Sequence, residues 1–194
     1  MTGIDIIAIT YGHTDILKCF INSIKSQTNK NWTLHIVHDG PNVELGKNLI
    51  DEGYVKDQVK FYQSKERAGN YGHNLRKWAL DNLVTRDFVL ITNADNYYVP
   101  VMVDEVLQNK DTDFIYFDCV HNYPHFHNKS SYGYLKAELK ICFIDMGCVV
   151  VRSILAKKVG FNHVHHSADW KYFEEILAQQ PNIKRIDKIL FVHN

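Results

Sequence analysis

The chain has 194 residues, of which 45% are hydrophobic and 23% are charged. This composition is typical of a globular protein rather than a disordered one, and the length supports a hydrophobic core without disulfides. Lys+Arg and Asp+Glu both number 22, so the zero net charge gives no electrostatic support for nucleic-acid binding. We therefore expect a single domain over residues 1–194 and no nucleic-acid partner.

The first 119 residues alternate between two patterns. Short apolar runs typical of buried strands alternate with segments whose apolar residues recur at helical spacing. The predicted strands are 4–10, 33–38, 59–62, 87–92 and 113–119. The predicted helices are 14–24, 43–52, a helix that begins at Asn70 or Tyr71 and runs to 83, and 100–108, where Pro100 suits the first turn.

The alternation stops at residue 120. Residues 120–138 are polar, aromatic and rich in histidine, and they lack a helical period, so we expect long loops or an antiparallel excursion. The pattern that follows predicts a strand over 142–151, helices over 153–159 and 169–178, and a closing strand over 184–192.

The cysteines and the apolar runs indicate in which cellular compartment the protein lies. The four cysteines show no CxxC spacing, and Cys19, Cys119 and Cys148 lie in apolar runs and are interpreted as buried thiols. Unpaired thiols favour a reducing compartment. No cleavable leader stands at the N-terminus, and no apolar run approaches the roughly 20 residues that cross a bilayer. These features predict a cytoplasmic protein without a transmembrane segment, and peripheral association with a membrane face stays open.

Strand–helix units joined by short connections predict an α/β fold, with a mostly parallel sheet and helices on both faces. Ligands in such sheets bind outside the carboxyl ends of the strands. Three turns leave strands at this edge, over residues 10–13, 39–41 and 93–96. Two of these turns carry a carboxylate, Asp39 and Asp95, which we therefore expect to lie close together.

Three acids each have a functional and a structural interpretation, and the sequence leaves both open. Asp39 accepts hydrogen bonds from a ribose hydroxyl or a base imide, or it closes the tight Asp-Gly-Pro turn. Asp95 binds Mg²⁺ or Mn²⁺ together with diphosphate oxygens, or it belongs to an ordinary turn. Asp169 acts as a general base on an acceptor hydroxyl, or it is an acid favoured by a helix dipole.

The histidines offer a second kind of ligand. His193 follows the last strand and is either a metal ligand or an exposed terminal group. His163, His165 and His166 have no cysteine or acid partner at standard spacing, which disfavours a zinc site. Neither GxGxxG nor GxxxxGK[ST] occurs, so a Rossmann dinucleotide site and a P-loop are both disfavoured.

Seven segments in order, 6–28, 32–40, 67–74, 89–100, 144–147, 168–170 and 191–193, carry a set of motifs along nearly the whole chain. Together they resemble motifs of the family 2 glycosyltransferases, inverting enzymes of the GT-A fold that use nucleotide sugars. Residues 6–28 are similar to the family's first strand and helix, and residues 32–40 to its second strand, which ends in the acid that contacts the nucleoside. The further matching segments are 67–74 (Asn-x-Gly…Arg-Asn), 89–100 (the Asp-x-Asp strand with a proline behind it), 144–147 (before the acceptor site), 168–170 (Glu-Asp-Trp) and 191–193 (the late strand with a metal-binding His).

Four positions depart from the family pattern. Arg67 stands in place of Asn, and His73 in place of Arg. Asn93 stands in place of the first Asp of Asp-x-Asp, and Ala168 in place of Glu. The two acids that the resemblance makes essential are unchanged, but the missing carboxylate at position 93 favours weaker metal binding.

The resemblance implies a GT-A fold with a mostly parallel central sheet, flanking helices and a small antiparallel excursion. Residues 1–100 would form the nucleotide-binding half, and residues 101–194 the acceptor-binding half. The implied enzyme is an inverting, hexosyltransferase-type glycosyltransferase of glycan biosynthesis. It would take a nucleotide diphosphate sugar, with UDP-sugars favoured over GDP- and dTDP-sugars, and transfer the sugar to a hydroxyl of a glycan or another acceptor.

The resemblance also implies residue roles. Asp169 would be the catalytic base, and Asp95 with His193 would hold Mn²⁺ or Mg²⁺. The implied contacts to the acceptor or sugar are Met146, Gly147 and Trp170. The implied nucleotide- and donor-binding residues are Thr10, Tyr11, Asp39, Arg67, Gly69, Asn74, Asn93, Ala94 and Asp95.

Two other functions stay open. A nucleotidyltransferase shares this sheet and its metal–diphosphate chemistry, but it usually carries a Gly-rich basic loop after the first strand, which residues 10–13 lack. Asn93 in place of Asp also leaves open a non-catalytic nucleotide-sugar-binding module of the same fold. Residues 121–134 either stack their rings on acceptor sugars or form an exposed surface loop.

Overall fold

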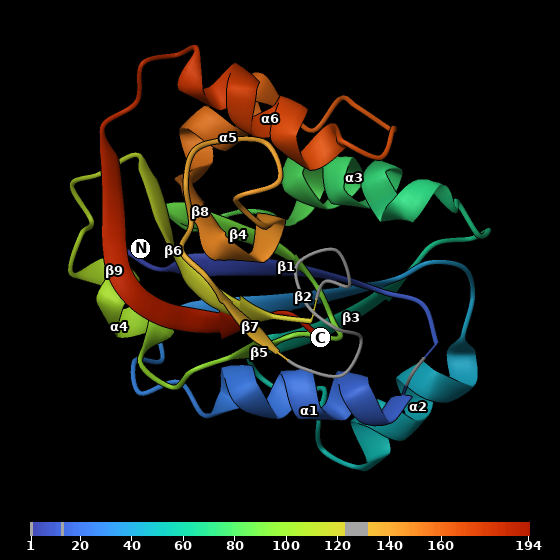
Figure 1. Cartoon of the computed structure of the whole chain (residues 1–194). Helices are drawn as coiled ribbons and strands as arrows, with labels where there is room; N and C mark the ends of the chain where they lie inside the picture. The colour runs from blue at the N-terminus through green and yellow to red at the C-terminus, as the bar shows by residue number, and fades with distance from the viewer. Residues whose placement is uncertain (1, 13, 123–131) are drawn as a thin grey trace.

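One sheet runs through the protein. The structure, a computed structural model, describes residues 2–12, 14–122 and 132–194. The described strands pair in the order β3-β2-β1-β4-β8-β6-β9-β5, and β7 pairs with β6 (Figure 1). Their bounds are β1 Ile4–Thr10, β2 Trp32–His38, β3 Val59–Gln63, β4 Phe88–Asn93, β5 Tyr97–Tyr98, β6 Phe114–His121, β7 Gly133–Leu135, β8 Val149–Arg152 and β9 Ile183–Val192.

The first half of the sheet is parallel and deeply buried. Every residue of β1 is buried, and β1 pairs in parallel with both β2 and β4. In this register Thr10 lies opposite His38, and Ile9 lies opposite Asn93. The three strands therefore end at the same level, and the turns that follow them meet at one edge of the sheet.

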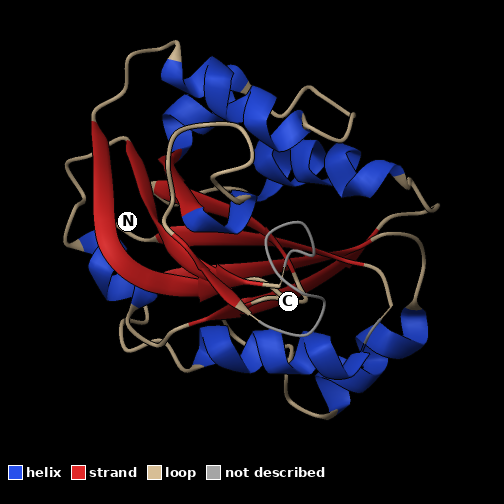
Figure 2. Cartoon of the chain, viewed as in Figure 1, coloured by secondary structure: helices blue, strands red, loops and turns tan. Residues whose placement is uncertain are grey.

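Helices cover both faces of the sheet (Figure 2). The apolar residues of β1 alternate between two cores, because successive side chains of a strand point to opposite faces. One core packs against α1 (Thr14–Lys25), α2 (Val43–Asp51) and α4 (Met102–Leu107). The other packs against α3 (His73–Leu83), α5 (Ser153–Val159) and α6 (Ala168–Leu177).

The second half of the sheet mixes directions, and this mixing brings the end of the chain back to the edge where β1 ends. β8 pairs antiparallel with β4 and β6, whereas β9 runs parallel to β6 and bends along its length (Figure 1). The short β5 pairs antiparallel with the end of β9, with Tyr97 opposite Val192. The Asn96 side chain accepts a hydrogen bond from the Asn194 N–H at 3.3 Å. His193 consequently lies beside the turn that carries Asp95.

Most predicted elements are confirmed, and the bounds predicted for β1 and α5 are those observed. The antiparallel excursion appears as β7. The strand predicted over 142–151 is wrong in extent: only Val149–Arg152 is strand, because Asp145 caps a tight turn over Met146–Cys148 by accepting the Gly147 N–H. The helix predicted to begin at Asn70 or Tyr71 is preceded there by a short 3-10 turn over Asn70–Gly72, and α3 itself begins at His73, because Tyr71 has a left-handed φ of 55°.

Two further observations concern the cysteines and the helices. Cys119 and Cys148 are buried as predicted, but Cys19 is exposed. Leu17, Phe20, Ile21 and Ile24 form the buried face of α1, and Cys19 falls on the opposite face. Among the described residues, no helix has both the length and the apolar character that a membrane crossing requires.

Candidate active site

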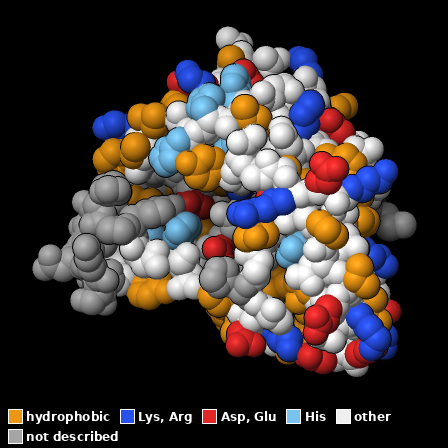
Figure 3. Space-filling model, turned by 90° about the vertical axis from the view of Figure 1, so that its right-hand side faces the viewer, with side chains coloured by type: hydrophobic (Ala, Val, Ile, Leu, Met, Phe, Trp, Pro, Cys, Tyr) orange, Lys and Arg blue, Asp and Glu red, His pale blue; other side chains and the backbone are white. Residues whose placement is uncertain are grey.

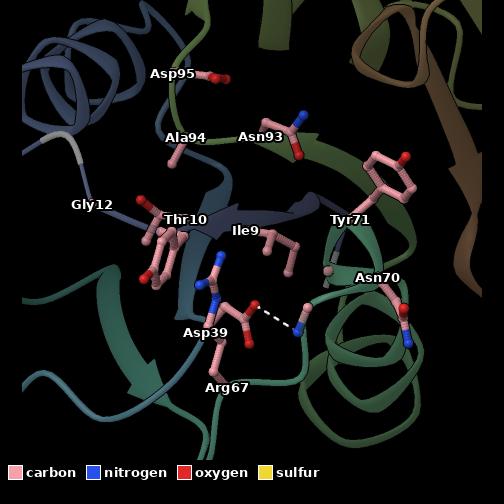
Figure 4. A pocket seen from close by; sticks show the side chains of 13 residues that line it. Ile9, Thr10, Gly12, Asp39, Arg67, Asn70, Tyr71, Asn93, Ala94 and Asp95 are labelled. Atoms are coloured by element: carbon pink, nitrogen blue, oxygen red, sulfur yellow. Dashed lines mark hydrogen bonds between the residues drawn. The ribbon is translucent and has the colours of Figure 1, made fainter.

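The turns after β1, β2 and β4 enclose a pocket of about 590 Å³ at the carboxyl edge of the sheet (Figure 4). In Figure 3 this edge faces the viewer, and acidic, basic and histidine side chains gather around its centre. The pocket is lined by Ile9, Thr10, Tyr11, Gly12, Asp39, Arg67, Gly69, Asn70, Tyr71, Gly72, Asn93, Ala94 and Asp95. All the predicted donor-binding residues are therefore brought together except Asn74, which is exposed on the first turn of α3 and lies outside the lining.

Asp39 anchors one wall of the pocket. It is only 5% exposed, and its carboxylate accepts the Ala68 N–H at 2.6 Å and the Gly69 N–H at 3.0 Å, of which Figure 4 draws the bond to Gly69. The side chain thus holds the loop of Arg67 instead of closing its own Asp-Gly-Pro turn. An ionised carboxylate has about four lone-pair sites, so acceptor capacity for a ligand remains.

Arg67 and Tyr11 form a flat, exposed surface at the mouth of the pocket. The Arg67 guanidinium carbon lies 3.8 Å from the centroid of the Tyr11 ring. Both side chains are exposed. A stacked guanidinium and phenol present a planar surface on which another planar group, such as a base, can stack.

A strained turn forms the opposite wall. Gly69, Asn70, Tyr71 and Gly72 all have positive φ angles, between 47° and 73°, which only glycine adopts without cost. A Cβ atom at Gly72 would lie 2.6 Å from Cγ2 of Ile9, so the turn packs directly on β1. The Tyr71 side chain is 69% exposed. Strain of this kind is concentrated at functional sites.

Behind this wall lies Arg76, which no sequence motif indicated. It is 3% exposed, and its guanidinium donates to the Tyr71 carbonyl at 2.5 Å, to Asn93 Oδ1 at 2.6 Å and to His73 Nδ1 at 3.0 Å. Its spacing from Ala79 and Leu80 places it on the buried face of α3. A charged residue on the apolar face of a predicted helix was the signal that would have identified it.

Asp169 lies in the first turn of α6, and its Oδ1 atom is buried without a hydrogen-bond partner in the described structure. Burial raises the pKa of this carboxyl, the Arg76 guanidinium opposes that shift, and the nearby Asp145 charge adds to it. The N-terminus of α6 flanks the pocket, since the His166 ring contacts the Tyr71 ring with centroids 6.0 Å apart. A buried carboxylate with a raised pKa is a better proton acceptor than an exposed one.

Oxygen and nitrogen donors suited to a divalent ion lie at the Asp95 turn. Asp95 is exposed, and it lines the pocket. His193 Nε2 lies 3.9 Å from Asp145 Oδ2. The described part of the chain contains no group of three or more His, Cys, Asp or Glu side chains that could hold a metal by themselves. Asp95 and His193 alone provide too few ligands for Mn²⁺ or Mg²⁺. They fit such an ion only if oxygens of the substrate phosphates complete its coordination.

The predicted acceptor residues do not belong to the lining of the pocket. Met146 and Gly147 are buried, and a Cβ atom at Gly147 would lie 2.5 Å from the Phe191 ring. Trp170 is half-buried and donates to Glu174 Oε1 at 2.8 Å. Within the segment 121–134, residues 123–131 lie outside the described residues, and Tyr132 donates to Asn194 Oδ1 at 2.6 Å. The acceptor roles stay predictions.

The sequence is similar to one curated glycosyltransferase. No protein-family model matches the chain. An uncharacterized glycosyltransferase of Methanocaldococcus jannaschii is 26% identical over 192 residues, which cover 96% of this chain and 57% of that relative. The chain therefore spans somewhat more than half the length of the relative it matches.

Solved structures share the fold. TarS of S. aureus in complex with UDP matches 100% of this chain over 61% of its own, with a TM-score of 0.79 and 15% identity. The mannosyltransferase PcManGT from Pyrobaculum calidifontis, in complex with GDP-Man and Mn²⁺, matches 97% of this chain over 56% of its own, with a TM-score of 0.70 and 14% identity. The predicted α/β fold class is thus confirmed, and so is the predicted resemblance to a glycosyltransferase family.

Proposed function

We propose that this chain, which resembles glycosyltransferases in both sequence and fold, transfers a sugar from a nucleotide diphosphate sugar to an acceptor hydroxyl with inversion at the anomeric carbon. The observation that carries the proposal is the convergence of Thr10, Asp39 and Asp95 on one pocket at the carboxyl edge of the sheet. Its volume falls within the range of pockets that hold small molecules and cofactors. The UDP and GDP-Man complexes of the structural neighbours support a nucleotide sugar as the ligand.

The donor would lie across the pocket. Thr10, Asp39 and the loop that Asp39 anchors would hold the nucleoside, and the stacked pair of Tyr11 and Arg67 would cover its base. The diphosphate would lie toward Asp95. Mn²⁺ or Mg²⁺, held by Asp95 and His193, would neutralise the charge that grows on the departing diphosphate.

Asp169 would remove the proton from the acceptor hydroxyl as that oxygen attacks the anomeric carbon from the face opposite the diphosphate. Its unpartnered Oδ1 and its raised pKa support this role, because a base works best when its pKa approaches the working pH. A single in-line displacement inverts the anomeric configuration. Positioning and fixed charges would supply most of the acceleration.

The test is a titration calorimetry panel of UDP-, GDP- and dTDP-sugars with and without Mn²⁺, combined with NMR of the sugar released or transferred. We expect binding of one nucleotide class and a product of inverted configuration. Binding without any turnover would instead support the non-catalytic module. A retained configuration would contradict the single displacement, and no binding in the panel would contradict the nucleotide-sugar site altogether.

The predicted division into nucleotide-binding and acceptor-binding halves, and the cytoplasmic location, are also part of this proposal. A nucleotidyltransferase remains the weaker alternative. The turn after β1 offers Tyr11 and Gly12 but no basic side chain among the residues described there.

A further inference from the structure

The strongest feature that the proposed mechanism does not use is the buried Arg76 behind the pocket wall. Its guanidinium makes hydrogen bonds to Asn93 and Tyr71, which both line the pocket, and to His73. None of the ion pairs found among the described residues includes Arg76. Burial lowers the pKa of Arg76, and the more distant charges of Asp169, Asp145 and Asp95 oppose that shift, so the side chain stays charged.

The contact with Arg76 fixes the orientation of the Asn93 amide. A guanidinium only donates hydrogen bonds, so the Asn93 atom that faces it at 2.6 Å must be the oxygen. The amide nitrogen is then on the other branch of a side chain that lines the pocket. No acceptor among the described residues bonds to that nitrogen, whose two N–H groups are left for a ligand.

The neighbouring His73 is in a protonation state that allows it to accept a hydrogen bond from Arg76. Burial and the adjacent Arg76 lower the pKa of His73 to about 4, so that its ring is neutral and Nδ1 accepts from the guanidinium. Of the two buried side chains Arg76 and His73, only Arg76 is therefore charged, and it lies directly behind the pocket wall. Its field in a site of low dielectric favours an anion in the pocket.

We propose that Arg76 is a positioning residue that holds Asn93 as a hydrogen-bond donor to an oxygen of the bound nucleoside diphosphate, and that Asn93 therefore takes no part in metal coordination. The inference rests on the proposed nucleotide-sugar site. It assigns opposite chemistry to the two ends of the segment 93–95: the amide of Asn93 donates to the ligand, whereas the exposed carboxylate of Asp95 accepts from it or binds its metal.

The decisive variant is Asn93→Asp, tested by calorimetric titration with UDP and with GDP, each with and without Mn²⁺. The substitution is isosteric, and the new carboxylate would face Arg76, so the fold should tolerate it. We expect the affinity for the better nucleotide to fall about tenfold with and without Mn²⁺, because one donor is lost and the charge of Arg76 is neutralised. Tighter Mn²⁺-dependent binding by Asn93→Asp would mean that position 93 faces the metal, and would overturn the proposal.

Asn70→Asp is the matched control. Asn70 also lines the pocket and is exposed, and aspartate tolerates its left-handed backbone. The variant adds the same charge to the same pocket without touching Arg76. We expect less than about a threefold change in nucleotide affinity. An equal loss of nucleotide affinity in Asn93→Asp and Asn70→Asp would show that the added negative charge in the pocket explains the whole effect, and would overturn the proposal.

A double-mutant cycle tests the role of Arg76 apart from its role in folding. Arg76→Gln should lower nucleotide affinity about tenfold when Asn93 is present, but less than about threefold in the Asn93→Ala background. A merely structural arginine would cause the same loss in both backgrounds. Absence of nucleotide binding by the wild-type chain would overturn the proposed function, whereas normal wild-type binding with no coupling in the cycle would overturn this inference alone.

Discussion

Two carboxylates of the protein, the buried Asp5 and the half-buried Asp169, have opposite surroundings. Asp5 lies in β1 at the edge of the sheet away from the pocket, and it accepts hydrogen bonds from His35 Nε2 at 3.0 Å, the Thr85 N–H at 2.6 Å and the Arg86 N–H at 2.7 Å. Asp169 lies beside the pocket, and one of its oxygens has no partner in the described structure.

The pKa values of the two acids move in opposite directions. Burial alone would raise the pKa of Asp5, but the His35 hydrogen bond and the two backbone N–H groups outweigh it, and the pKa is lowered. Burial dominates at Asp169, and the pKa is raised. A buried acid whose oxygens are all bonded stabilises the fold, whereas one with a vacant oxygen costs stability and is available for chemistry.

The largest expected effect is that of Asp169→Asn. Removal of a general base should lower kcat about a thousandfold while nucleotide affinity changes less than about threefold. The check is the rate of sugar transfer, with nucleotide titration in parallel. Asp51→Asn, an exposed acid on α2, serves as the control and should leave kcat unchanged. Turnover near the wild-type rate in Asp169→Asn would remove the base assignment.

The pH dependence follows from the raised pKa of Asp169. The folded state holds the proton more tightly than the unfolded chain, so this acid destabilises the fold above its raised pKa, and the effect vanishes below about pH 4. Asp169→Asn should therefore melt at a temperature equal to or above that of the wild type at pH 7. In the wild type, kcat should fall as the pH drops through the raised pKa, since the base becomes protonated.

Asp95→Asn should have the next largest effect. Loss of this carboxylate should reduce transfer about a hundredfold, because it removes the main oxygen donor for the metal. A chelator should reduce wild-type activity by a similar factor, and Mn²⁺ should restore it. Measurement of the rate against Mn²⁺ concentration checks both points. Full wild-type activity in excess chelator would contradict metal assistance and leave Asp95 as an ordinary turn residue.

Asp5→Asn should do the reverse of Asp169→Asn: we expect a loss of about 3 kcal/mol in the free energy of unfolding, with kcat at 25 °C unchanged within about twofold. The stability that Asp5 contributes is present above its unfolded pKa and is lost as the pH falls through the lowered folded value. Denaturant unfolding at pH 7 and pH 3 measures it. A destabilisation that is equally large at pH 3 would contradict the electrostatic explanation.

Much of the fold follows from local patterns in the sequence. The apolar run Ile4–Thr10 can be buried on both faces only as a central strand, and its predicted bounds are those observed. The carboxyl-end rule then brought Asp39 and Asp95 to one edge, as the pocket lining confirms. The start of β8 was harder to predict from the sequence. It depends on the turn that Asp145 caps before the strand, and no local periodicity in the sequence indicates that turn.

The candidate site was predictable only in part, because two of its features depend on tertiary contacts. The left-handed turn before α3 places non-glycine residues Asn70 and Tyr71 at positive φ, which their residue types disfavour. The turn is maintained by contacts from elsewhere, including the Arg76 hydrogen bond to the Tyr71 carbonyl. The burial of Arg76 was not predicted, because a charged side chain in a helix is usually solvated.

The smallest expected effect concerns the stacked pair at the mouth of the pocket, where neither side chain is buried. Arg67→Ala should weaken nucleotide binding two- to fivefold, since an exposed cation–π contact contributes little and the planar surface for the base is lost. Arg67→Lys keeps the charge but not the plane, so it should weaken binding almost as much. Affinity restored by Arg67→Lys would show that charge rather than stacking is what the ligand uses, and this edge of the site would then recognise phosphate instead of a base.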